Sequence, residues 1–83
     1  MILPNKHLKM YESLIYLSGI IIKYLKNPKY LEDIWQHINK LNNKKNKKYD
    51  TIYSFDKVVK SVDMLYVLGL VKINEYGMLE RCD

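Results

Sequence analysis

The 83-residue sequence has no alanine, one arginine, one cysteine, two prolines and three glycines. The single cysteine excludes an internal disulfide and fits a reducing cytoplasm. The scarcity of glycine and proline excludes a fibrous or linker-like chain. Hydrophobic residues make up 48% and charged residues 28%, which is typical of a folded domain and too apolar for a disordered tail. The length allows one small domain.

The sequence also lacks the residue combinations that catalysis or metal binding requires. The two histidines, His7 and His37, are far apart in the sequence, and no motif places either beside a nucleophile. Cys82 is the only cysteine, so no ligand spacing of the zinc type exists. A glycine-rich phosphate loop is missing as well. The sequence therefore predicts no catalytic residue, no metal site and no cofactor.

A mostly apolar stretch at residues 14–22 is too short to span a bilayer. Glu12 precedes it, Lys23 and Lys26 follow it, and no small-residue cleavage site ends it, so we expect no secretory signal. We interpret the stretch as a buried helix and expect no membrane partner.

The net charge of +5 and the sequence pI of about 9.3 point to nucleic acid or another acidic surface as a partner. Five lysines within residues 40–48 account for the whole excess, because the other nine basic residues balance the nine acidic ones. Clustered lysines bind the phosphate backbone without reading bases. The alternative is a solvated loop whose lysines reflect A/T-rich codons, which the missing alanine also indicates.

Hydrophobic spacing predicts two helices in the first half of the chain. Residues 10–26 place Leu14, Leu17, Ile21 and Leu25 on one face, and further isoleucines widen that face until the helix must be buried on several sides. Asn27 and Pro28 end it. Residues 30–41 form the second helix, whose inner face carries Leu31, Ile34, Trp35, Ile38 and Leu41.

A third helix and a hairpin are predicted in the second half. Ser54 is a good N-cap, Asp56 suits the first turn, and Gly69 is the expected left-handed C-terminal cap. The buried stripe is expected to contain Phe55, Val58, Val59, Val62 and Leu65. Residues 71–73 and 78–81 then flank a glycine turn at residues 74–77 and predict two strands.

This order predicts a mainly α fold with a small β-hairpin, namely a winged helix-turn-helix domain of three helices plus a C-terminal wing. We expect a single domain at residues 10–83, preceded by an extended arm at residues 1–9, because Pro4 disfavours a regular helix there.

The outward positions of the third helix are expected to include Asp56, Lys57, Lys60, Ser61, Asp63 and Met64. Two acids cancel two lysines, and no arginine, asparagine or glutamine is present to make a bidentate base contact. Phosphate contact is therefore a better hypothesis than base reading. The candidate nucleic-acid contacts are Lys40, Lys44, Lys45, Lys47, Lys48, Lys57 and Lys60.

Eight tyrosines are many for so small a core. Most fit the edge of a core, and some can anchor a protein interface. We expect the interface on the N-terminal arm and on the exposed side of the first helix. Its candidate residues are Ile2, Leu3, Pro4, His7, Leu8, Tyr11 and Ile15.

Three segments carry a resemblance to a known family: Met1-Ile2-Leu3-Pro4-Asn5-Lys6-His7-Leu8, the block from Ser54-Phe55-Asp56 to Asp63-Met64-Leu65-Tyr66-Val67-Leu68-Gly69, and Gly77-Met78-Leu79-Glu80-Arg81. With them the chain resembles the small middle component of ABC-three-component systems, bacterial antiphage operons of the Lamassu type. The resemblance covers nearly the whole chain, and the lysine-rich loop at residues 42–48 departs from the family pattern.

The resemblance implies a non-enzymatic adaptor that bridges an SMC-like or Rad50-like ABC ATPase, which senses DNA, and a nuclease or other effector subunit. The middle component would help to hold the effector inactive, and DNA would be reached through the complex. Two alternatives stay open. One is a free-standing, dimeric winged-helix transcription regulator, and the other is an antitoxin-like inhibitor that binds an enzyme and no DNA.

Overall fold

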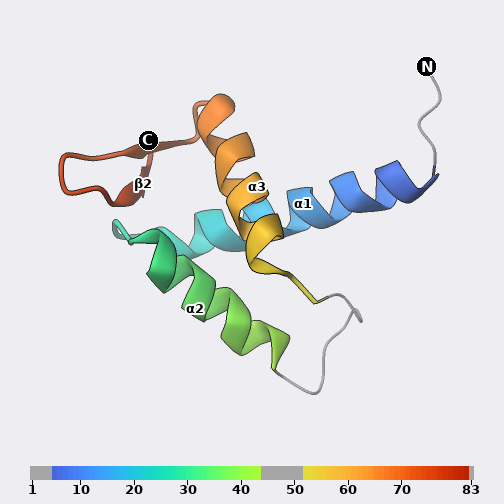
Figure 1. Cartoon of the computed structure of the whole chain (residues 1–83). Helices are drawn as coiled ribbons and strands as arrows, with labels where there is room; N and C mark the ends of the chain where they lie inside the picture. The colour runs from blue at the N-terminus through green and yellow to red at the C-terminus, as the bar shows by residue number, and fades with distance from the viewer. Residues whose placement is uncertain (1–4, 44–51, 83) are drawn as a thin grey trace.

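The structure is a computed structural model that describes the backbone of residues 5–43 and 52–82 and the side chains of residues 11–43 and 52–82 (Figure 1). Its elements are α1 (Asn5–Tyr24), α2 (Leu31–Asn42), α3 (Phe55–Val67), β1 (Val71–Ile73) and β2 (Leu79–Arg81). The predicted fold class is confirmed: three helices precede a C-terminal antiparallel hairpin, an arrangement consistent with a winged helix.

Helix α1 begins earlier than the sequence pattern indicates. It starts at Asn5, so the predicted extended arm is wrong for residues 5–9, which are helical. Proline restricts the residue before it and is tolerated at the start of a helix, so Pro4 is compatible with a helix that begins directly after it. Residues 1–4, the rest of the predicted arm, lie outside the described residues.

The core forms where the three helices and the hairpin meet. The predicted inner face of α1 is confirmed, since Leu14, Leu17, Ile21 and Leu25 are all buried. The other elements contribute Ile34, Ile38, Tyr53, Val58, Leu65, Val71 and Leu79. Helix α1 is nevertheless open on its other side, where Ile15 is 63% exposed, so it is less enclosed than its apolar composition predicts.

Helix α3 crosses α1 (Figure 1), and Ser18 of α1 and Ser61 of α3 meet at one carbonyl group. The prediction that Ser61 points outward is wrong: the residue is fully buried, because residues 58, 61 and 65 share one helical face. Its hydroxyl donates to the Leu14 carbonyl at 3.4 Å, and the Ser18 hydroxyl donates to the same oxygen at 2.7 Å. These small side chains allow the two helices to pack closely while their polar atoms stay satisfied.

Phe55 does not belong to the buried stripe, although its spacing placed it there. It is the first residue of α3 and is 46% exposed. Its ring instead contacts Trp35 of α2 edge-to-face, with 5.5 Å between the ring centroids.

The hairpin is attached to the helices through the connection between α1 and α2. Lys29 and Leu79 form an isolated antiparallel bridge, in which the Lys29 N–H donates to the Leu79 carbonyl at 3.0 Å and the Leu79 N–H donates back at 2.7 Å. Lys29 thus pairs with β2 on the side opposite β1, with which β2 pairs in the register Ile73–Leu79.

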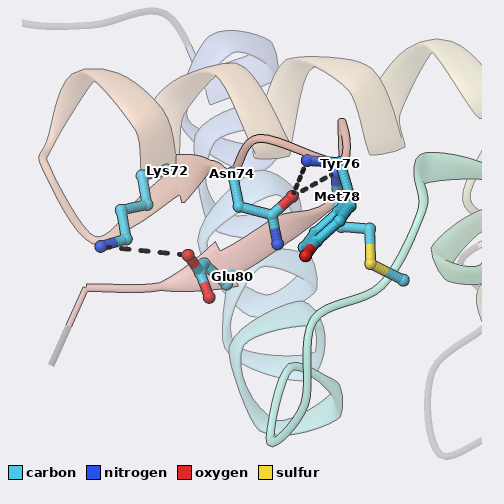
Figure 2. Close-up of polar contacts among 5 residues, drawn as sticks. All are labelled: Lys72, Asn74, Tyr76, Met78 and Glu80. Atoms are coloured by element: carbon cyan, nitrogen blue, oxygen red, sulfur yellow. Dashed lines mark hydrogen bonds and ion pairs between the residues drawn. The ribbon is translucent and has the colours of Figure 1, made fainter.

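The predicted glycine turn of the hairpin is confirmed. The Asn74 side-chain oxygen accepts from the backbone N–H of Tyr76 at 2.9 Å and of Met78 at 3.0 Å (Figure 2). Gly77 has a φ of 79°, a conformation that favours glycine. Further along the two strands from the turn, Lys72 and Glu80 form a cross-strand ion pair of 3.9 Å (Figure 2).

The lysine-rich connection between α2 and α3 is closed by hydrogen bonds between Asn42, the last residue of α2, and the backbone of Tyr53. The Asn42 amide nitrogen donates to the Tyr53 carbonyl at 2.7 Å, and its amide oxygen accepts from the Tyr53 N–H at 2.9 Å. Both backbone groups of a buried residue are therefore satisfied by one side chain. The start of α3 is held next to the end of α2 by this pair of hydrogen bonds.

We expect Asn42→Ala to lower the free energy of unfolding by about 1–3 kcal/mol, because it leaves two backbone groups of Tyr53 without partners. Urea unfolding followed by circular dichroism measures the change. Asn39→Ala, at an exposed position on the same helix, is the control and should change stability by less than about 0.5 kcal/mol. Equal losses in the two variants would contradict this role of Asn42.

Two glycines should respond oppositely to the same substitution. Gly69 follows α3 with a φ of 77°, so Gly69→Ala should destabilise the protein by about 1–2 kcal/mol. Gly19 lies inside α1 with open space where a Cβ would be, so Gly19→Ala should stabilise it by about 0.5–1 kcal/mol. Thermal unfolding of both variants checks the signs, and a shift in the same direction would refute the assignment of Gly69 as the helix cap.

Candidate functional site

The N-terminal half of α1 extends past α3 and away from the rest of the fold (Figure 1). Among the described side chains of α1, the first buried one is Leu14. Tyr11 is 44% exposed and Ile15 is 63% exposed, so two large apolar side chains one turn apart lie open to solvent on this part of the helix. An exposed tyrosine and isoleucine on one helix can anchor a protein contact. We refer to Tyr11 and Ile15 as the α1 surface.

The α1 surface contains two of the seven residues predicted for a protein interface. His7 and Leu8 lie on the backbone of α1, but their side chains are outside the described set. Ile2, Leu3 and Pro4 lie outside the described residues altogether. In sequence, Leu8, Tyr11 and Ile15 are spaced by three and then four residues, which is the spacing of one helical face.

The predicted nucleic-acid residues fall into two groups. Lys40 is exposed in the last turn of α2, Lys57 is half-buried in α3, and Lys60 is exposed on α3. The remaining four, Lys44, Lys45, Lys47 and Lys48, lie outside the described residues.

Lys60 is already engaged within α3. Its ammonium group lies 3.0 Å from the Asp56 carboxylate, and both side chains are more than half exposed. An exposed pair of this kind contributes little to stability, but it places a negative charge beside the lysine. Asp56 thereby weakens the attraction of this part of α3 for phosphate.

The described part of the chain is nearly neutral in charge. Residues 11–43 and 52–82 contain eight basic and seven acidic side chains. The net charge of +5 therefore resides mainly at residues 1–10 and 44–51. An acidic partner would thus be attracted mainly to residues 1–10 and 44–51 and less to the rest of the chain.

Helix α3 offers few groups that read bases. Its exposed residues are Phe55, Asp56, Lys60, Asp63, Tyr66 and Val67. None of these is an arginine, asparagine or glutamine, the residues that make the commonest bidentate contacts with guanine or adenine.

The sequence patterns missed an apolar surface at the end of α3 and in the turn after it. Val67 is 82% exposed, Leu68 is 62% exposed and Leu70 is 47% exposed. Val67 lies outside the helical face that contains Val58 and Leu65, and this angular offset was a usable signal. For Leu68 and Leu70, the sequence contains no comparable signal of exposure.

A shallow hollow between α1 and α2 is lined by Ile20, Lys23, Tyr24, Lys26 and His37. The rings of Tyr24 and His37 stack at a centroid distance of 4.0 Å, and the Lys29 ammonium lies 5.1 Å from the Tyr24 ring centre. This hollow contains no serine or cysteine that His37 could activate. Within residues 5–43 and 52–82, no three histidine, cysteine, aspartate or glutamate side chains are grouped closely enough to hold a metal ion.

The comparison with protein families assigns the chain to a known family. A family model described as ABC-three component (ABC-3C) system Middle Component 6 matches residues 3–82. This protein belongs to the Middle Component 6 family. The match covers α1, α2, α3 and both strands, so the whole described fold is the family's domain. No curated protein and no solved structure gives a significant match.

As a middle component, the protein is one part of a three-component system, and partner subunits are implied by that membership. The resemblance seen in the sequence is thus confirmed at the level of the ABC-3C middle components. In the described parts of this Middle Component 6 protein, no helix combines the length and the apolar character needed to cross a membrane.

Proposed function

We propose that this protein is a non-enzymatic adaptor subunit of an antiphage defence complex of the Lamassu type. In this proposal it bridges an SMC-like or Rad50-like ABC ATPase and a nuclease or other effector subunit, and it couples DNA sensing by the ATPase to control of the effector. The family match over residues 3–82 carries the proposal, because it assigns almost the entire chain to a middle component of a three-component system.

The exposed apolar side chains support an adaptor role. A middle component that joins two subunits needs two separate protein surfaces. The N-terminal half of α1 lies at one end of the molecule in Figure 1, and the hairpin lies at the other end. Helix α1 alone has 20 residues, which corresponds to a length of about 30 Å, so partners at the two ends need not compete for space.

The lysine cluster is the proposed contact with DNA that the ATPase holds. Lys44, Lys45, Lys47 and Lys48 lie between α2 and α3, and Lys40 is exposed in the last turn of α2. Because lysines at this density contact phosphates without reading bases, the contact would be independent of sequence. The near-neutral α3 favours an auxiliary DNA contact over a role in operator recognition.

The α1 surface can be tested by co-purification with the two other subunits of the system. We expect Ile15→Asp to reduce recovery of one subunit at least tenfold, because it places a charge in an apolar interface. Ile52→Asp is the matched control, since Ile52 is 67% exposed and Ile15 is 63% exposed. Both variants should fold, because neither side chain is in the core. If Ile15→Asp recovers both subunits as well as the unmodified protein does, this interface is excluded.

The lysine cluster can be tested through the salt dependence of DNA binding by the assembled complex. Replacing Lys44, Lys45, Lys47 and Lys48 by glutamine should reduce the slope of log affinity against log salt by up to about 3.6, because each phosphate that a lysine neutralises adds about 0.9 to the slope. The control replaces Lys23 and Lys26, two exposed lysines near the end of α1, and should leave the slope unchanged. Unchanged slopes in both variants would remove DNA contact from the proposal and leave the adaptor role intact.

A further inference from the structure

Strand β1 forms the outer edge of the small sheet. Strand β2 pairs with β1 on one side and with Lys29 on the other, whereas β1 pairs only with β2 among the described residues. The Cys82 N–H donates to the Leu70 carbonyl, and the Asn74 N–H donates to the Met78 carbonyl. Hydrogen-bonded pairs therefore occur at residues 70, 72 and 74 of this side of the hairpin.

The alternation leaves the backbone groups of Val71 and Ile73 directed away from β2. The same rule holds on β2, where the N–H and carbonyl of Leu79, opposite Ile73, point away from β1 and bond to Lys29. At Val71 and Ile73, no residue in the described part of the chain takes the corresponding place. Val71 is only 3% exposed, so the fold covers its two groups, and the N–H and carbonyl of Ile73 are the pair open to one more strand.

Apolar side chains surround this open edge. Ile73 is 59% exposed at the end of β1, and Leu68 and Leu70 are exposed in the turn that leads into the strand. Val71, on the same face of the sheet as Ile73, is buried against the helices. A further strand would therefore place an apolar side chain beside Ile73 and extend the core over the exposed isoleucine.

We propose that β1 binds an extended strand from a partner subunit, with an acidic residue between two apolar residues, and adds it to the hairpin sheet. The proposal rests on the adaptor function and identifies a second protein surface on the hairpin, at the end of the molecule opposite the N-terminal half of α1. Strand addition supplies affinity through backbone hydrogen bonds and specificity through alternate side chains.

Lys72 is the reason to expect an acidic residue in the incoming strand. It projects from the opposite sheet face to Ile73, is exposed, and is held only at 3.9 Å by Glu80. A residue of the incoming strand next to Lys72 lies within reach of its ammonium group, and a carboxylate there forms a favourable cross-strand pair. A second copy of this chain fits less well, because symmetric pairing of Val71 with Ile73 puts Lys72 directly opposite its own counterpart.

The test is residue-resolved amide hydrogen exchange of the full chain, alone and in the complex with the other two subunits. In the free chain, the Lys72 amide should exchange slowly and the Ile73 amide rapidly. In the complex, we expect the Ile73 amide to slow at least tenfold, because it now donates a hydrogen bond.

Two substitutions at one position separate the backbone contact from side-chain effects. Ile73→Pro removes an N–H that the hairpin itself does not use, and edge strands tolerate proline at such a position. It should weaken binding of the partner subunit about tenfold or more, while Ile73→Thr, which keeps the N–H, should weaken it less than about threefold. Thermal unfolding of both free variants checks that the hairpin stays folded.

The outcomes distinguish this inference from the adaptor proposal. If no complex forms with either subunit, both fail together. If a complex forms and the Ile73 amide still exchanges rapidly, or if Ile73→Pro binds as tightly as Ile73→Thr, strand addition alone is overturned. Slow exchange of the Ile73 amide in a free chain with the mass of a dimer overturns it in favour of pairing between two copies.

Discussion

The crossing of α1 and α3 is the contact on which the rest of the structure depends. Leu17 and Ile21 of α1 and Val58 and Leu65 of α3 belong to one buried cluster, and among the described residues no other two elements approach each other over a longer stretch. The approach is possible because Ser18 and Ser61 are small, and it is tolerated because both hydroxyls donate to the Leu14 carbonyl. A larger side chain at residue 61 would separate the helices, whereas an unpaired polar group there would cost desolvation energy.

The helix ends and the hairpin turn could be predicted from the sequence because one local residue type satisfies the backbone there. Ser54 caps α3 by accepting from the Lys57 N–H, Gly69 and Gly77 take positive φ, and Asn74 closes the turn. These features depend on neighbours within four residues, so the sequence alone was sufficient to predict them. The inner face of α1 was equally clear from its spacing.

Features that depend on contacts between residues far apart in the sequence could not be predicted in this way. The burial of Ser61 requires α1 to lie across it, and the two hydrogen bonds of Asn42 require Tyr53, eleven residues away. The open edge of β1 is visible only once Lys29 is known to occupy the other side of β2. Of the candidate interface, the sequence identified Tyr11 and Ile15 from composition and spacing, whereas the exposure of Val67 and Leu68 depends on what the fold leaves uncovered.

The distribution of charge separates the proposed tasks of the molecule. The helices and the hairpin carry almost balanced charges, and their exposed large side chains are apolar at both ends of the fold. A near-neutral, partly apolar surface favours protein contacts because little charge must be desolvated. Lysines gather in the connection between α2 and α3, and Asn42 holds the two ends of that connection next to each other through Tyr53. In the proposed function DNA contacts these lysines, and the apolar surfaces of α1 and of the hairpin remain available to protein partners.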